Sequence, residues 1–403
     1  MGEFQDTAYG PIPSKWRFVP ASEYCSRVTD GTHDSPKPQV VGMPLVTSKH
    51  IKGRSIDFET TYLITKQEYD KINQRSAVEQ WDVIISMIGT CGMTYVERNH
   101  DIGYAVKNVG LFKTGDRLKA LWLDYFLKSS VGRNILDQLQ GGTTQAYIAL
   151  GALRSLPVLV PTKNEQEAIV TLLGSLDDKI DLLHRQNKTL EAMAETLFRQ
   201  WFVEEAEEGW EEFVLTDVAT HCKDSVNPGK YPTRVYHHYS LPAYDEGRKP
   251  SPELGEEIKS SKYVVPENAV LISKLNPRFP RVWPIRKRKH EHPISSTEFQ
   301  VFVPKKEEMF GFLYCFLISK PVQDELASAA SGTSGSHQRV SPDDIKNLSF
   351  QAKSKQQLVD FSKGVDPMLE KIESNKDQVA NLTALRDTLL PKLMSGEVRV
   401  ECS

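Results

Sequence analysis

The strongest constraint on the fold of this 403-residue chain is a long heptad-patterned segment that occurs twice, 192 residues apart. Along each copy, mostly apolar residues alternate steps of four and three, which is the spacing of a helix that buries one stripe against a partner helix. Each stripe runs for ten positions, or roughly 50 Å at 1.5 Å per residue. Two such stripes predict two long helices that pack together, although the core face of an ordinary globular helix has the same spacing.

The predicted interface between the two helices is the seam of these stripes. Its residues are Ile169, Leu173, Leu176, Ile180, Leu183, Asn187, Leu190 and Leu197 in the first copy, and Phe361, Val365, Ile372, Asn375, Val379, Leu382 and Leu389 in the second. If the helices are antiparallel with their midpoints facing, Asn187 and Asn375 oppose each other. We hypothesise that they form a polar layer that fixes register; two independent, solvent-exposed breaks are the alternative.

The sequence also indicates where the two helices begin. Residues 162–165 (Thr-Lys-Asn-Glu) and 354–357 (Ser-Lys-Gln-Gln) both fit the capping box, in which two side chains satisfy free backbone N–H groups. Pro367 lies inside the second copy and follows Asp366. Proline lacks the helical N–H donor, so we expect it to kink or restart that helix.

The repeat divides the chain into two globular domains and two helices, since 403 residues exceed one ordinary domain. We expect an α+β fold with a pseudo-two-fold internal repeat: a domain over residues 1–155, a helix over 156–204, a second domain over 205–350, and a helix with its tail over 351–403. Weaker echoes support this plan. Residues 81–86 resemble 268–273, and residues 123–127 resemble 313–317.

Several classes of protein are disfavoured. The chain is 39% hydrophobic and 26% charged, as globular proteins are, and no apolar run approaches the roughly 20 residues of a membrane span. No secretory signal is evident, so we expect a cytoplasmic protein. The histidines have no metal-ligand spacing, and no CxxC pair occurs among the five cysteines, so neither metal nor disulfides are expected.

Enzyme signatures are missing as well. The sequence has no Gly-x-Gly-x-x-Gly, no P-loop, and no Asn/Asp-Pro-Pro-aromatic string for methyl transfer to an exocyclic amine. Asp343 and Asp344 could suggest a metal-dependent nuclease, but adjacent carboxylates at a helix start fit an N-terminal cap better. The sequence therefore predicts no catalytic residue and no cofactor on this chain.

Charge is sorted along the chain in a way that favours nucleic-acid binding despite a net charge of −3. Residues 278–289 hold six basic side chains, no acidic ones, and interleaved aromatics, which suits a phosphate backbone, although a solvated hairpin has the same composition. Gly-, Ser- and Thr-rich strings recur at 141–145 and 335–338. Small residues let backbone approach a strand, hydroxyls donate to phosphate, and Gln can pair with adenine.

Our candidate DNA-contacting residues combine these loops, the polar string at 30–33 and the basic segment. They are Thr32, His33, Arg54, Thr143, Thr144, Gln145, Lys274, Arg278, Arg281, Arg286, Lys287, Arg288, Lys289, Ser336, His337, Gln338 and Arg339.

Taken together, these strings resemble the specificity subunit of Type I restriction-modification systems. The resemblance extends over nearly the whole chain. It is strongest at residues 156–169, 176–180 and 197–202, and it includes Asp30-Gly-Thr-His33, Gly141-Gly-Thr-Thr-Gln145 and the tail at 389–397. Recognition domains of this family vary widely, so the resemblance assigns no base-reading residue.

The resemblance implies two target-recognition domains, each reading half of a split, asymmetric double-stranded DNA target, with two antiparallel helices as the spacer. It also implies a non-catalytic subunit that recruits two modification subunits, which bind S-adenosylmethionine and methylate adenine, and a restriction/translocase subunit. A chain cut after about residue 205 is expected to be able to dimerise through its helix and read a symmetric site. A two-domain adaptor that spaces protein partners without DNA readout, and a nuclease or self-sufficient methyltransferase, are the rival hypotheses.

Overall fold

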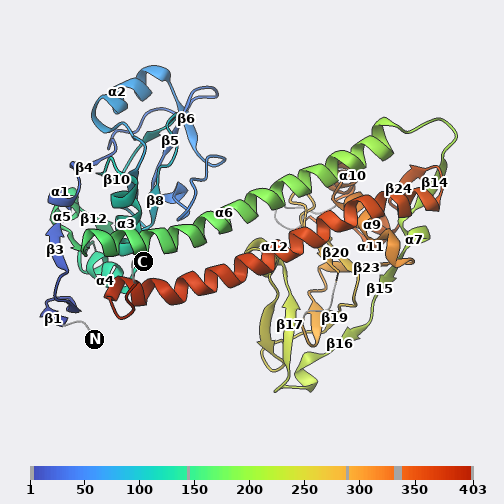
Figure 1. The fold of residues 1–403 in the computed structure, drawn as a ribbon. Coiled ribbons are helices and arrows are strands. Elements are labelled where there is room, and N and C mark those ends of the chain that lie inside the picture. The colour runs from blue at the N-terminus through green and yellow to red at the C-terminus, as the bar shows by residue number, and fades with distance from the viewer. Residues whose placement is uncertain (1–3, 143–145, 287–289, 331–337, 401–403) are drawn as a thin grey trace. The chain divides into compact units, whose positions relative to one another are not determined.

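The computed structural model describes residues 4–142, 146–286, 290–330 and 338–400, and the chain forms two compact units (Figure 1). Unit 1 comprises the chain up to Asp181 together with the segment from Gln378 onward, and unit 2 comprises Leu182–Asp377. Each unit therefore contains one globular part and a portion of each of two long helices. These helices are α6 (Lys163–Arg199), which continues into a π-helical turn (Gln200–Glu204), and α12 (Lys355–Ser395).

Unit 1 is built around a four-stranded antiparallel sheet in the order β4-β10-β7-β8. Its strands are β4 (Arg27–Asp30), β10 (Val109–Lys113), β7 (Asp82–Ser86) and β8 (Thr94–Val96). Every residue of β7 is buried, which explains the unbroken apolar run of residues 83–85 between Asp82 and Ser86. A smaller sheet pairs β5 (Met43–Val46) with β6 (Tyr62–Ile64) and with β9 (Ala105–Val106).

Helices cover this sheet. The helix α3 (Arg117–Lys128) contacts β7 and β8, and α4 (Ser130–Gln138) packs against α3. The other elements of unit 1 are β1 (Phe4–Thr7), β2 (Gly10–Pro13), β3 (Arg17–Pro20), α1 (Ala21–Tyr24), a 3-10 turn (Ser48–His50), α2 (Lys66–Ser76), β11 (Gln140–Gly141), β12 (Tyr147–Ile148), α5 (Leu150–Ser155) and β13 (Pro157–Val160).

Unit 2 repeats the plan, with a four-stranded antiparallel sheet in the order β15-β23-β20-β21. Its strands are β15 (Ala219–Cys222), β23 (Phe299–Pro304), β20 (Ala269–Ser273) and β21 (Val282–Ile285), covered by α9 (Phe310–Ile318) and α10 (Lys320–Ala329). The second sheet is larger here, in the order β16-β19-β22-β17-β18: β16 (Ser225–Val226), β19 (Lys262–Val264), β22 (Pro293–Ser295), β17 (Val235–Tyr239) and β18 (Ser251–Leu254).

The remaining elements of unit 2 are β14 (Glu211–Val214), α7 (Leu215–Val218), α8 (Leu241–Asp245), α11 (Pro342–Lys346), β24 (Ser349–Ala352) and 3-10 turns at Pro228–Lys230 and Glu307–Met309. In both units, the strand just before the long helix pairs with a strand near the start of the globular part, β13 with β3 and β24 with β14. The four-stranded sheet, its covering helices and the strand pair beside the long helix thus occur in both units, whereas the second sheet has three strands in unit 1 and five in unit 2.

The weak sequence echoes fall on equivalent elements. Residues 81–86 and 268–273 contain the central strands β7 and β20, and the residue before each, Trp81 or Asn268, has a positive φ of 68° or 54°. Residues 123–127 and 313–317 lie in α3 and α9. A serine, Ser129 or Ser319, ends each of these helices and occupies the N-cap position of the next, although only the Ser129 side chain makes a capping hydrogen bond.

The start of α6 is as predicted, and the start of α12 differs. Glu165 N–H donates to Thr162 Oγ1 at 3.4 Å and Thr162 N–H to Glu165 Oε2 at 3.3 Å, which confirms the first capping box. Near α12, Gln357 Oε1 accepts from Lys353 N–H at 2.7 Å instead of from Ser354. The Gln357 side chain is thus an acceptor, as predicted, but the N–H group that donates to it belongs to Lys353.

The restart of the second helix that we expected at Pro367 does not occur, because α12 runs without interruption from Lys355 to Ser395. Pro367 is exposed, and so is Lys363, the residue whose carbonyl loses its N–H donor. Water can hydrate that carbonyl on the exposed face. The opposite face is anchored by buried Val365 and Leu369.

The predicted seam lies on the covered faces of α6 and α12, where all fifteen of its residues are buried or half-buried. In unit 2 the hypothesised polar layer is present: Asn375 Nδ2 donates to Asn187 Oδ1 at 2.8 Å, with both residues buried. In unit 1 the end of α12 enters the core, where Leu393 and Met394 are buried in the same apolar cluster as Leu173.

Candidate nucleic-acid interface

Each unit holds two loops together at the end of its central strand, and we call them the paired loops. In unit 1 they are residues 87–92 and 139–148, joined by Ile148 N–H to the Met87 carbonyl (2.9 Å) and Gly89 N–H to the Ala146 carbonyl (3.0 Å). In unit 2 they are residues 274–280 and 330–340. The matching bonds run from Val340 to Lys274 (3.0 Å) and from Asn276 to Gln338 (2.8 Å).

The paired loops share backbone geometry but not side chains. Gly89 and Asn276 occupy equivalent positions, and both have a positive φ, 78° and 49°. Around Gly89 the loop is small and polar, with Thr90 exposed and Tyr147 49% exposed on the partner loop. The predicted contacts Thr143, Thr144 and Gln145 belong to this loop but lie outside the described residues.

The unit 2 loop is basic and aromatic. Arg278 is exposed and Phe279 is 66% exposed, while Lys274 is half-buried beside the strand end. Within the described ranges, no acidic side chain lies at ion-pairing distance from Lys274 or Arg278. Gln338 is half-buried next to Asn276. Ser336, His337, Lys287, Arg288 and Lys289 lie outside the described residues.

Three predicted arginines of unit 2 are instead engaged by carboxylates. Arg339 Nε and Nη2 bond to Glu298 at 3.2 and 3.1 Å, and Arg281 bonds in the same bidentate way to Asp245 at 2.8 and 2.9 Å. Such fork-shaped pairs orient the guanidinium. They hold the loop ends, so these two side chains buttress the basic loop.

Arg286 is nearly as enclosed as Arg281. Its side chain is 18% exposed and pairs with Asp366 on α12 at 2.5 Å, and its guanidinium lies 5.1 Å from the ring centre of Phe310. Burial raises the pKa of Asp366, against the opposing effect of Arg286. Arg286 therefore binds the globular part of unit 2 to its long helix, which is a structural role that the sequence did not suggest.

Thr32 and His33 follow the edge strand β4 of unit 1. The two ring nitrogens of His33 lie 2.9 Å from Asp30 Oδ2 and 2.9 Å from Asn108 Oδ1, and its side chain is 62% exposed. Asp30 is buried and also pairs with Arg75, so the string at 30–33 is only partly the exposed loop we expected. Thr32 Oγ1 accepts from Asp34 N–H at 3.1 Å.

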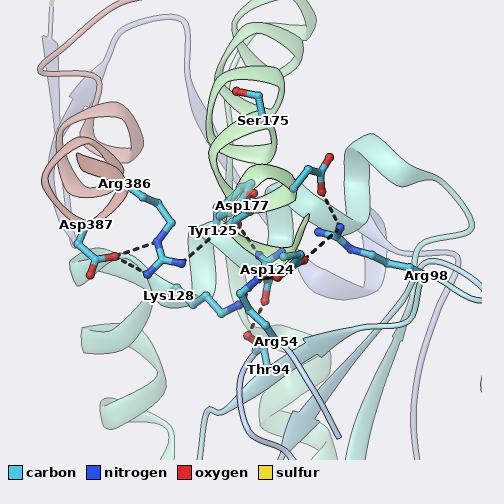
Figure 2. A network of polar contacts seen from close by, with 12 residues as sticks. Arg54, Thr94, Arg98, Asp124, Tyr125, Lys128, Ser175, Asp177, Arg386 and Asp387 are labelled. Atoms are coloured by element: carbon cyan, nitrogen blue, oxygen red, sulfur yellow. Dashed lines mark hydrogen bonds and ion pairs between the residues drawn. The ribbon is translucent and has the colours of Figure 1, made fainter. Parts of the chain in front are cut away.

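Arg54 belongs to a buried polar network around Asp177 on α6. Figure 2 shows the side chains of Arg54, Tyr125 and Arg386 converging on this carboxylate, at 2.6, 2.7 and 3.0 Å. Asp177 is 2% exposed, and Arg54 also pairs with Asp181. The proximity of Asp177 and burial together raise the pKa of Tyr125, burial being the larger effect.

A shallow groove of about 700 Å³ lies on the second sheet of unit 2, lined by Arg234, Tyr236, Glu291 and His292 among others. The Tyr236 hydroxyl is buried there with no hydrogen-bond partner among the described residues. In the part of the chain that the structure describes, no cluster of three metal-ligating side chains occurs, and no helix has the length and apolarity to cross a bilayer. Cys25, Cys91, Cys222 and Cys315 are free thiols.

Comparison with known proteins identifies this architecture. The family model described as Type I restriction modification DNA specificity domain matches residues 33–192. The MjaIX specificity subunit of Methanocaldococcus jannaschii, a Type I restriction enzyme subunit, is 25% identical over 457 residues, covering 99% of this chain and 97% of that protein. The chain is thus similar over nearly its whole length to Type I specificity subunits, and residues 33–192 match their DNA specificity domain.

Further similarities agree with this assignment. The Type I restriction enzyme HindI specificity subunit of Haemophilus influenzae is 24% identical over 332 residues, covering 63% of this chain and 72% of that protein. The crystal structure of the S subunit of a Type I restriction-modification system from M. genitalium has the same fold. The match covers 96% of this chain and 97% of that chain, with a TM-score of 0.58 at 16% identity.

Sequence reasoning missed several residues that organise the two units of this protein. Glu298, Asp245 and Asp366 hold basic side chains from distant segments, and no local pattern marks such pairs. Arg386 did leave a signal, because it is a charged residue that continues the heptad spacing of the second copy, four residues after Leu382 and three before Leu389. A charged seam residue needs a buried partner, and Asp177 is that partner.

Proposed function

We propose that this specificity subunit reads a bipartite, asymmetric DNA target, one half-site through the paired loops of each unit. The long helices, which contribute to both units, set the spacing between the half-sites. The observation that carries the proposal is that one loop architecture occurs twice with unlike side chains: Gly89, Thr90 and Tyr147 in unit 1, and Lys274, Arg278 and Phe279 in unit 2. Equal scaffolds with unequal loops suit two different half-sites.

The contacts divide by chemistry. Exposed Arg278 is suited to phosphate or guanine, and exposed Phe279 to stacking or to a thymine methyl group. In unit 1 the hydroxyl of Thr90 and the ring of Tyr147 are placed for phosphate contact and packing. The sequence-predicted residues Thr143 to Gln145, Lys287 to Lys289, Ser336 and His337 are part of the same proposal, together with Thr32, His33 and Gln338.

Methyl transfer and cleavage belong, in this proposal, to partners. The chain recruits two modification subunits, which bind S-adenosylmethionine and methylate adenine, and a restriction/translocase subunit, and it acts in the cytoplasm. A specificity subunit of this kind holds no cofactor of its own. Its DNA affinity falls steeply with salt, because phosphate contacts release counterions.

The test combines binding and methylation. The purified chain with its modification subunits is expected to methylate one split sequence, mapped by sequencing modified bases, and the chain alone is expected to transfer no methyl group. Methylation by the chain alone would support the self-sufficient enzyme, and assembly with protein partners without any DNA preference would support the adaptor.

A paired variant tests the unit 2 loop. Replacing Lys274 and Arg278 together by alanine should weaken binding and lower the slope of log affinity against log salt by about 2, one for each phosphate that is no longer neutralised. The matched control is Lys305 and Lys306, two exposed lysines that follow the end of β23. The unit 2 loop lies at the other end of that strand, because Ser273 pairs with Phe299. Their replacement should change the slope by much less. If both double variants had the same slope of log affinity against log salt, a role of the unit 2 loop in DNA binding would be contradicted.

A further inference from the structure

The packed faces of α6 and α12 contain two buried polar pairs, one in each unit. In unit 1, Arg386 Nη1 donates to Asp177 Oδ1 at 3.0 Å, and the Asp177 side chain is 2% exposed. In unit 2, Asn375 donates to Asn187 at 2.8 Å, and these residues are 0% and 8% exposed. Both pairs join the first heptad copy to the second.

None of these four residues is matched by a polar one in the other copy. At the 192-residue offset, the counterparts of Asp177 and Asn187 are Leu369 and Val379, and those of Asn375 and Arg386 are Leu183 and Ala194. In unit 2, Ala194 and Leu369 are buried in one apolar cluster. The layer that is ionic in unit 1 is thus apolar in unit 2.

This mismatch determines which helices can pair. In a dimer of two identical helices related by a two-fold axis, each polar residue loses its usual partner from the other heptad copy. It faces instead the residue of its own copy that lies at the equivalent position. In a pair of α6 helices, Asn187 would face Leu183, and Asp177 would face Ala194 and be without Arg386. In a pair of α12 helices, Asn375 would face Val379, and Arg386 would face Leu369. Every such layer occurs twice in the dimer and leaves a buried amide or charge without its cross-helix partner.

We propose that these two polar pairs are a pairing code that joins the first half of the chain to the second half and disfavours association of two identical halves. The code reverses the expectation, drawn from the repeat alone, that a first-half fragment pairs readily with itself. It requires no DNA, so it goes beyond the proposed function. Its consequence is that two unlike globular domains stay together, in place of two copies of one.

The experiment uses the full chain, folded first and then cut at a protease site inserted in the exposed segment 205–209. The cut protein is diluted until the halves exchange and is then concentrated, and native mass spectrometry separates the three dimers by mass. The first-half with second-half dimer should exceed each homodimer by roughly 30-fold or more, since each homodimer contains at least two orphaned buried groups. Homodimers in comparable amounts would overturn the proposal.

A repeat-symmetrised variant tests whether the polar pairs are the cause. It combines Asp177→Leu, Asn187→Val, Asn375→Leu and Arg386→Ala. Each polar residue is thus replaced by the residue type that the other heptad copy has at the equivalent position. Homodimers should then rise toward the statistical share, while circular dichroism of the uncut variant checks that it is folded. The control Lys188→Ala with Asn381→Ala changes exposed positions of the same helices and should behave as the original chain. A symmetrised variant that still forms only the mixed dimer, or that does not fold although all its seam residues are apolar, would contradict the pairing code.

Discussion

Unit 1 and unit 2 have the same scaffold and different recognition loops. The central strands β7 and β20 are both fully buried, and the same backbone hydrogen bonds join the loops that follow them. Yet the loop after β7 is small and contains glycine, and the loop after β20 contains Arg278, Phe279 and two prolines. The strand ends are held by packing, whereas the tips of the loops are exposed to solvent. The side chains that would contact DNA can therefore vary without destabilising the fold.

The long helices also carry different side chains at equivalent positions of the two units. Here the difference changes how the helices pack. In unit 1 the seam contains the ionic network of Asp177, Arg54 and Arg386, whereas the equivalent layer in unit 2 is the apolar contact region of Ala194 and Leu369. In unit 2 the ionic contact is made elsewhere, by Arg286 to Asp366. Each unit thus has an enclosed ion pair between its globular part and a long helix, at a different place in the two units.

The largest expected effect is on unit 1. Asp177→Ala should lower its free energy of unfolding by about 3 kcal/mol, because Arg54 and Arg386 would lose the buried carboxylate that they share and keep only the more exposed Asp181 and Asp387. Hydrogen exchange resolved by residue would measure this in unit 1 separately from unit 2. The neighbouring Asp178→Ala removes a more exposed carboxylate, 49% accessible, and should cost under about 1 kcal/mol. Similar destabilisation by both variants would mean that the network is not what fastens α6.

The next effect separates stability from DNA binding in unit 2. Arg286→Ala should lower the free energy of unfolding of unit 2 by about 2 kcal/mol, since the pair with Asp366 is largely enclosed. It should leave the salt dependence of DNA affinity unchanged, unlike the Lys274 and Arg278 variant. Denaturant unfolding and DNA titrations over a range of salt would measure the two quantities. A lowered salt slope for Arg286→Ala would return this residue to the DNA interface.

A smaller effect tests the shared backbone of the paired loops. Gly89→Ala should cost about 1 kcal/mol from the positive φ alone, because a Cβ at this glycine would meet nothing within 4 Å. Asn276→Gly, at the equivalent place in unit 2, should be nearly neutral. Thermal unfolding would compare the two. If Gly89→Ala were also neutral, the two loops would not share the strained conformation.

The smallest effect concerns pH in unit 2. Burial lowers the pKa of His238, against the effect of Glu253 at 3.0 Å; Lys262 adds to the lowering. The unfolded chain therefore takes up a proton first, so stability is present above about pH 6.5 and is lost as the pH falls below it. His238→Gln should flatten this dependence in a series of denaturant titrations. An unchanged slope would assign the acid sensitivity to other groups.

The sequence predicted the repeat, the two long helices, the first capping box and the Asn187 to Asn375 pair, because heptad spacing and capping are local patterns. It failed at Pro367, where an exposed face tolerates the missing hydrogen bond. It also could not assign roles to Arg54, Arg281, Arg286 and Arg339, since a basic residue looks the same whether it faces solvent or a distant carboxylate. Tertiary ion pairs join segments far apart in the chain, and no local spacing marks them.

The most direct test of two-part recognition is hydroxyl-radical footprinting of the chain with its modification subunits on a DNA that contains the methylated sequence. Two protected patches separated by a less protected spacer are expected. The Lys274 and Arg278 variant should lose protection at one patch while the other persists. A single continuous patch, or equal loss at both patches in that variant, would contradict the account that each unit reads its own half-site.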